Sequence, residues 1–135
     1  MEAQERLITT VKAKAGLAKY QTIITSGSHS IIVDEPESNG GADAGMDPQA
    51  LLLASLGSCT AITLRMYIDR KQWPIHEINV DVELLNIGFI KNIKCLISYT
   101  GDLSAEQQLR LVQIADACPI HKILAKSMVI ETALK

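Results

Sequence analysis

The sequence predicts a small mixed domain in which antiparallel strands accompany two helices. Residues 76–85 alternate between apolar and polar side chains, which is typical of a strand with one solvated face. A capping box at residues 104–107 begins a helix that carries one apolar stripe. A longer helix is predicted over residues 48–71, because an Asp-Pro pair supplies its N-cap and its first residue.

Turn residues and alternating patterns place the remaining elements. In chain order they are a strand over residues 6–14, a hairpin of strands 20–25 and 29–33, a glycine-rich loop over 34–47, a strand over 90–99, and a strand over 128–134 that closes the sheet.

Length and composition restrict the class of protein. The 135 residues fit a single domain over residues 1–135. The net charge is -2, which does not fit the basic stripe that nucleic-acid binders usually carry. No uninterrupted apolar run reaches the ~18–20 residues of a membrane span, so none is expected. The N-terminus has no basic start followed by an apolar stretch, and a cytoplasmic location is therefore expected.

The helix over residues 48–71 is too apolar for one small chain to cover. Its first 17 residues carry no charge, and such a helix is buried on every side. Small residues recur along it at three- and four-residue spacing: Ala54, Gly57, Ser58 and Ala61. We expect a homodimer in which two of these helices pack together. The alternative is a monomer whose core helix uses small residues beside a sheet.

Two of the three cysteines have contrasting local surroundings. Cys95 lies in a strand among apolar neighbours, which predicts a buried and inert thiol. Cys118 precedes Pro119 and is therefore predicted as the N-cap of a short final helix. The helix dipole, with His121 or Lys122 close by, lowers the pKa of a thiol at that position. A capping cysteine without chemistry is the alternative.

The third cysteine, Cys59, lies in the middle of the apolar helix. Burial there raises a thiol pKa, so a buried core cysteine is one interpretation. A zinc site is another, but Cys118 and His121 supply only half of a ligand set. No second closely spaced pair completes it, and no metal is expected.

Two segments resemble the signature of the OsmC/Ohr superfamily. The first is GGADAGMDPQALLLASLGSCT over residues 40–60, with RMY at 65–67 and RKQWP at 70–74 just downstream. The second, IADACPIHK over residues 114–122, is similar to the family's second cysteine motif. The resemblance covers the chain from about residue 6. It implies an α+β fold of antiparallel sheets packed on a long buried central helix, in an intertwined homodimer.

The resemblance also implies that Cys59 and Cys118 meet and react in turn. Cys59 is then the peroxidatic cysteine, which attacks a hydroperoxide and becomes a sulfenic acid. Cys118 resolves it to a disulfide, and an external dithiol reduces the pair. No cofactor is implied. The apolar helix is expected to line a pocket that favours organic hydroperoxides over hydrogen peroxide.

The sequence departs from the family at the residues that activate the first cysteine. Gln49 and Ala50 occupy the positions where the two branches of the family carry glutamate. Other candidates for a supporting role are His29, His121 and Arg65, which lies off the helix face of Cys59 and would act from the partner chain. A rival function follows from this departure, namely a non-peroxidatic dimer of the same fold that binds an apolar small molecule or a persulfide.

Overall fold

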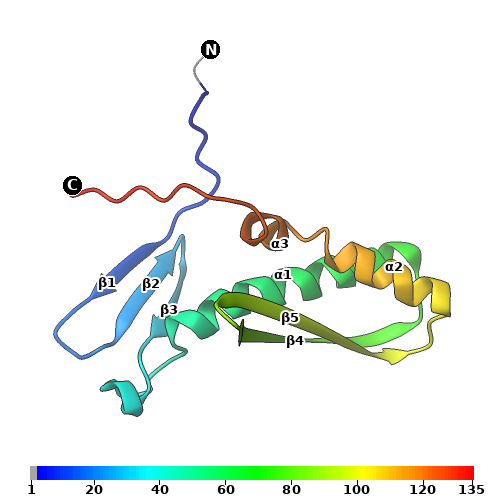
Figure 1. Ribbon diagram of the computed structural model, residues 1–135, viewed down its shortest axis with the longest axis horizontal. Helices are drawn as coiled ribbons and strands as arrows, with labels where there is room; N and C mark the ends of the chain where they lie inside the picture. Colours follow the sequence, from blue (N-terminus) through cyan, green and yellow to red (C-terminus); the bar gives the residue numbers. More distant parts are fainter. Residues whose placement is uncertain (1–2) are drawn as a thin grey trace. The chain divides into compact units, whose positions relative to one another are not determined.

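The computed structural model describes residues 3–135, which divide into two compact units with the boundary between Leu52 and Leu53. The elements in chain order are β1 (Lys12–Ala15), β2 (Thr22–Ser26), β3 (His29–Val33), the 3-10 helix η1 (Glu37–Asn39), α1 (Pro48–Lys71), β4 (Ile75–Ile87), β5 (Ile90–Gly101), α2 (Ala105–Ala115) and α3 (Pro119–Leu124) (Figure 1). Helix α1 begins in the first unit and continues in the second. The single domain expected from the length stays a prediction.

The N-terminal unit is a three-stranded antiparallel sheet in the order β1-β2-β3. The predicted hairpin is confirmed, and its two-residue turn places Gly27 at a φ of 59°, which glycine adopts without strain. The first strand is shorter than predicted, since only Lys12–Ala15 pairs with β2. Strand β2 ends at Ser26, so residues 6–11 have no backbone ladder to join.

A single carboxylate organises the predicted loop over residues 34–47. The side chain of Asp34 is buried, and its two oxygens accept from the amides of Tyr20, Glu35, Ala42 and Ala44 at 2.8–3.2 Å. Burial acts to raise the pKa of Asp34, but the four amide donors together lower it. The loop is therefore folded around a buried negative charge.

The C-terminal unit is built on a long hairpin of β4 and β5, as the alternating patterns predicted. Val82 of β4 stands opposite Cys95 of β5, so their side chains lie on one face of the hairpin. A Cβ added at Gly57 of α1 would lie 3.2 Å from Val82. Gly57 thus lets α1 approach the sheet of its own chain. This use of a small residue is the one that the monomer alternative predicted.

The core of this unit joins α1, the start of β4, and α2. The capping box is confirmed, because Ser104 Oγ accepts from the Gln107 amide and the Gln107 side chain accepts from the Ser104 amide. Helix α2 then presents its apolar stripe to the core, whose buried members are Leu64, Ile68, Ile75, Leu111 and Ala115.

The strand predicted over residues 128–134 is wrong. These residues form no regular structure, and Val129 and Ile130 are 88% and 85% exposed. The pattern showed apolar residues with β propensity, but a strand also requires a partner edge, and none pairs with this segment among the described residues of the chain.

Helix α1 buries only one stripe within the described chain: Leu56, Thr60, Leu64 and Ile68. Ile62 and Met66 are 55% and 63% exposed, so an apolar flank stays uncovered. By length and composition α1 is also apolar enough to cross a membrane, although counting uninterrupted apolar residues excluded a span. One such helix is weak evidence, because the core helix of a soluble protein meets the same criterion.

Candidate active site

Cys59 and Cys118, which are 59 positions apart in the sequence, lie close enough for each thiol to shift the pKa of the other, and Thr60, the residue after Cys59, donates a hydrogen bond to Cys118 Sγ at 3.8 Å. Cys59 lies in the middle of α1, and Cys118 is the N-cap of α3. Both are free thiols. The proximity that the family resemblance implied is therefore present, and the catalytic roles of the two cysteines stay predictions.

Cys118 is a buried thiol surrounded by hydrogen-bond donors. Its side chain is 0% exposed, and its Sγ accepts from the His121 amide at 3.4 Å and from Thr60 Oγ1 at 3.8 Å. Burial acts to raise the pKa of Cys118. The donors, which are the Cys59 thiol, the His121 amide, the Thr60 hydroxyl and the Ile120 amide, outweigh burial and lower it. The predicted N-cap with a depressed pKa is thus present, and its position fits a stabilised thiolate.

Cys59 is half-buried and has the opposite tendency. Burial is the largest cause that raises the pKa of Cys59, followed by its hydrogen bond to Cys118. The negative charge of Cys118 raises it further, and the Ile120 amide and the Thr63 hydroxyl lower it only in part. Of the two thiols, Cys118 is therefore the one that loses its proton more readily.

Two threonines of this site were missed at the level of the sequence. Thr60 contacts Cys118, and Thr63 contacts Cys59. A residue four positions after Cys59 lies on the same helix face, so helical periodicity alone could have pointed to Thr63. Thr60 needed the position of α3, which the sequence does not give.

The prediction that Cys95 is buried is wrong, and the prediction that it is inert stays a prediction. Cys95 is exposed and lines a cavity of about 410 Å³. Partial burial raises the pKa of Cys95, and so do the negative charges of Cys118 and Asp116 nearby. Alternation placed Cys95 on the correct face of β5, but it could not show that this part of the face is left open. The other lining residues are Leu56, Lys91, Asn92, Ile93, Asp116, His121, Leu124 and Ala125.

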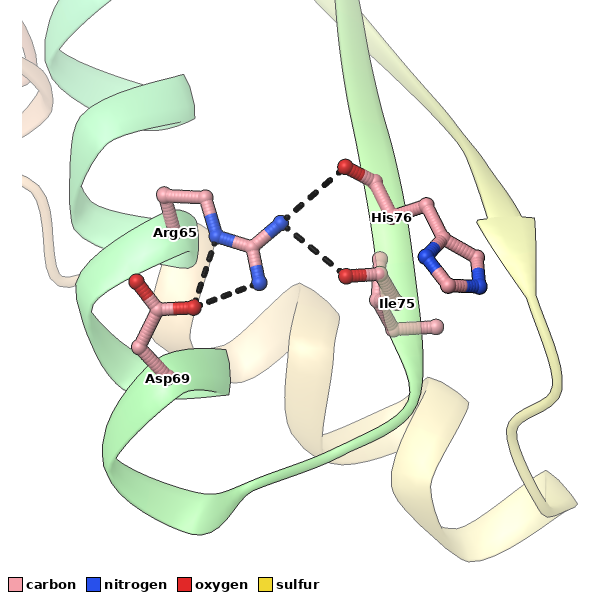
Figure 2. A network of polar contacts seen from close by, with 4 residues as sticks. All are labelled: Arg65, Asp69, Ile75 and His76. Carbon is pink, nitrogen blue, oxygen red and sulfur yellow. Dashed lines mark hydrogen bonds and ion pairs between the residues drawn. The ribbon is translucent and has the colours of Figure 1, made fainter.

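Arg65 has contacts away from the thiol pair within the chain (Figure 2). Its Nε and Nη2 donate to Asp69 Oδ1 at 2.9 and 2.6 Å, and its Nη1 donates to the carbonyls of Ile75 and His76 at 3.1 and 3.4 Å. These bonds fasten the start of β4 to the last turns of α1. A role for the Arg65 of a second chain stays a prediction.

The other candidates have different positions. The His121 side chain lies 3.8 Å from the Asp116 carboxylate, and it is the amide of this residue that donates to Cys118 Sγ. His29 and Gln49 are exposed residues of the N-terminal unit, and their supporting roles stay predictions. Within residues 3–135, no three His, Cys, Asp or Glu side chains are grouped as metal ligands.

Three features point to one class of protein. They are the β4–β5 hairpin, the long helix α1 with Cys59 in its middle, and Cys118 at the start of α3. Residues 40–133 match the OsmC-like protein family, and the chain belongs to that family. Comparison with curated protein sequences gives no match.

Solved structures agree with this assignment. An OsmC-like protein from Mycoplasma pneumoniae is similar at a TM-score of 0.69 and 18% identity, over 90% of this chain and 89% of that one. The organic hydroperoxide resistance protein OsmC from Legionella pneumophila has a TM-score of 0.63 and 19% identity, over 90% and 91%. OhrB of Bacillus subtilis, an organic hydroperoxide resistance protein, has a TM-score of 0.59 and 25% identity, over 87% and 90%. The predicted α+β fold with antiparallel sheets and a long helix is confirmed.

Proposed function

We propose that this protein is a thiol-dependent hydroperoxide reductase that uses Cys59 and Cys118. One observation carries the proposal, which is the proximity of the two free thiols: Thr60, next to Cys59 in α1, donates a hydrogen bond to Cys118 Sγ at 3.8 Å. A half-buried Cys59 is open to a small oxidant, whereas Cys118 is shielded and adjacent, as a resolving thiol should be. Family membership and relatives named for organic hydroperoxide resistance support the same reaction.

The reaction proceeds in three steps. The Cys59 thiolate attacks the O–O bond of the hydroperoxide, forming a sulfenic acid and releasing an alcohol. Cys118 then displaces the sulfenic oxygen as water and forms a disulfide with Cys59. An external dithiol reduces that disulfide by exchange and leaves as the oxidised form.

An organic hydroperoxide is the substrate class that the surroundings favour. The cavity at Cys95 is bordered by Asp116 and His121, which flank Cys118 in the sequence. Apolar side chains of Leu56 and Leu124 line the same cavity and suit an alkyl group better than water or hydrogen peroxide. The protein should therefore reduce cumene hydroperoxide faster than hydrogen peroxide. Equal rates would contradict the proposed preference for organic hydroperoxides.

A homodimer in the cytoplasm completes the proposal. The exposed apolar flank at Ile62 and Met66 needs a cover, and a second copy of α1 supplies one. A reducing compartment keeps the thiol pair ready for the next turnover. Light scattering should give twice the mass of one 14.7 kDa chain, and a monomer at micromolar concentration would contradict the dimer.

Thiol titration tests the reductase directly. One equivalent of tert-butyl hydroperoxide should remove two titratable thiols per chain within seconds. The Cys59→Ser variant should lose none to this reaction, whereas the control Cys95→Ser should still lose two. Unchanged thiols in the unmodified protein would refute the proposed reaction.

Gln49 and Ala50 favour a second candidate, because they replace the glutamate that activates the family's first cysteine. In that case the protein is a non-peroxidatic dimer that holds an apolar small molecule or a persulfide in the cavity at Cys95. It would then show no thiol loss with hydroperoxide, but a saturable shift in melting temperature with an apolar ligand.

A further inference from the structure

Thr60 places a buried hydroxyl in the apolar stripe of α1. The residue is 2% exposed, and the other buried members of the stripe are Leu56, Leu64 and Ile68. A valine has the same shape and would fill this position without burying a polar group, so packing alone gives no reason for the hydroxyl. The reason has to lie in what the hydroxyl binds.

The hydroxyl of Thr60 departs from the usual behaviour of a helical hydroxyl, which donates to a backbone carbonyl three or four positions earlier. Ser58 of the same helix behaves in the usual way, since its Oγ donates to the Ser55 carbonyl at 3.2 Å. Thr60 Oγ1 instead donates to the sulfur of Cys118, the N-cap of α3, at 3.8 Å. The single proton of this hydroxyl is therefore directed at the thiol pair.

A second donor holds the Cys118 sulfur from another helix. The sulfur also accepts from the His121 amide at 3.4 Å, which is the N-cap bond of α3. A cysteine side chain has three staggered rotamers, and donors from two helices together select one of them. Because Cys118 is fully buried, water does not compete for these bonds. The sulfur is thus held against the turn of α1 that contains Cys59, the residue directly before Thr60.

We propose that Thr60 is a positioning residue for the disulfide step, and that its hydroxyl keeps the sulfur of Cys118 beside Cys59. The inference rests on the proposed hydroperoxide reductase and concerns the second step of that reaction. In this step the Cys118 thiolate attacks the sulfenic sulfur of Cys59. The S–S bond forms as the S–O bond breaks, and solvent protonates the departing hydroxide to water. Holding the attacking atom near its target reduces the entropy that the step loses.

Disulfide formation can be followed without any hydroperoxide by using 4,4′-dithiodipyridine, which releases one absorbing thiopyridone at each thiol attack. In a Cys95→Ser background the half-buried Cys59 should react first, and Cys118 should then displace a second thiopyridone from the Cys59 sulfur. Cys118→Ser in the same background should stop the reaction after one release. A single release with both thiols present would overturn the inference, because Cys118 would then not reach Cys59.

Thr60→Val tests the positioning role in this assay. The second release should slow about five-fold, the change in rate that corresponds to one lost hydrogen bond, whereas the first release should keep its rate. The control Thr100→Val, at an exposed position of β5, should change neither release. An unchanged second release would contradict the inference. Equal slowing of both releases would also contradict it, since that pattern indicates general damage to the fold.

A second pair of variants isolates the hydroxyl from the shape of the side chain. Serine and alanine at position 60 differ only in the hydroxyl, and both lack the methyl group of threonine. The second release should therefore be faster in Thr60→Ser than in Thr60→Ala, and close to that of the unmodified protein. Equal rates in the two variants would show that the hydrogen bond has no part in the step, and the inference would fall.

The pH dependence of the second release separates position from acidity. Burial raises the pKa of Cys118, and the Thr60 hydroxyl is one of the donors that lower it, so its loss also reduces the thiolate present at neutral pH. At alkaline pH Cys118 is a thiolate in every variant, and Thr60→Val should still be the slower protein. A difference that closes at alkaline pH would show that Thr60 only adjusts acidity, and would refute the positioning role.

Failure of the reductase has a different signature from failure of this inference. If tert-butyl hydroperoxide consumes no thiols while the second release depends on the Thr60 hydroxyl, the proposed function is refuted and the positioning role stands. If hydroperoxide consumes both thiols while the second release is indifferent to Thr60, the inference is refuted and the proposed function stands.

Discussion

Replacing Arg65 with methionine separates a structural role of this residue from an activating one. Arg65→Met removes an exposed ion pair with Asp69, worth ~0.5 kcal/mol. It also removes the bonds to the carbonyls of Ile75 and His76, of which the shorter, at 3.1 Å, is worth ~1 kcal/mol. The methionine stem keeps most of the packing of the arginine stem. The free energy of unfolding should therefore fall by ~1–2 kcal/mol.

Thermal unfolding measures this loss, and it is done at fixed chain concentration because the proposed dimer would make the melting temperature depend on concentration. A loss of that size lowers the melting temperature of a small unit by roughly 5–10 °C. Arg70→Met, at an exposed position of the same helix, is the matched control and should stay within ~0.5 kcal/mol. Sulfenic acid formation on Cys59 in Arg65→Met should keep its rate. A slow reaction with unchanged stability would refute the structural role.

Three further predictions follow from burial and charge. Leu64→Ala, at a fully buried core position, should cost ~2–5 kcal/mol in chemical denaturation, and a cost below ~1 kcal/mol would show that this core is mispacked. The pKa of Asp34 is lowered on folding from its ordinary 3.8, so its contribution to stability is present above that value and is lost as pH falls through the folded pKa. The Ala42 and Ala44 amide resonances should report this loss, and Asp34→Asn should abolish their pH dependence. In native reduced protein, a maleimide should modify Cys95 while Cys118 stays protected until unfolding, and early labelling of Cys118 would contradict its burial.

The parts of the fold that depend on local sequence could be predicted. The capping box at Ser104 and the Cys118 N-cap use donors and acceptors within one turn, so short motifs determine them. The alternation of β4 and β5 likewise fixes which side chains share a face. The same local reasoning gave Cys118 as the better thiolate, since the helix terminus provides the donors.

The parts of the fold that depend on a partner distant in the sequence could not be predicted. Residues 6–11 and 128–134 have strand-like composition, but a strand exists only where another edge accepts it. Cys95 would be buried only if another part of the chain covered its position on β5. The alternating pattern does not show whether such a cover exists. The contact of Thr60 with Cys118 required the placement of α3 against α1.

Mapping the disulfide that a hydroperoxide produces is the most direct test of the thiol pair. The protein is treated with one equivalent of tert-butyl hydroperoxide, digested without reduction and analysed by mass spectrometry. The account predicts an intramolecular bond between the peptides that contain Cys59 and Cys118, with the Cys95 peptide free. No disulfide, or one that includes Cys95 in place of either partner, would contradict it.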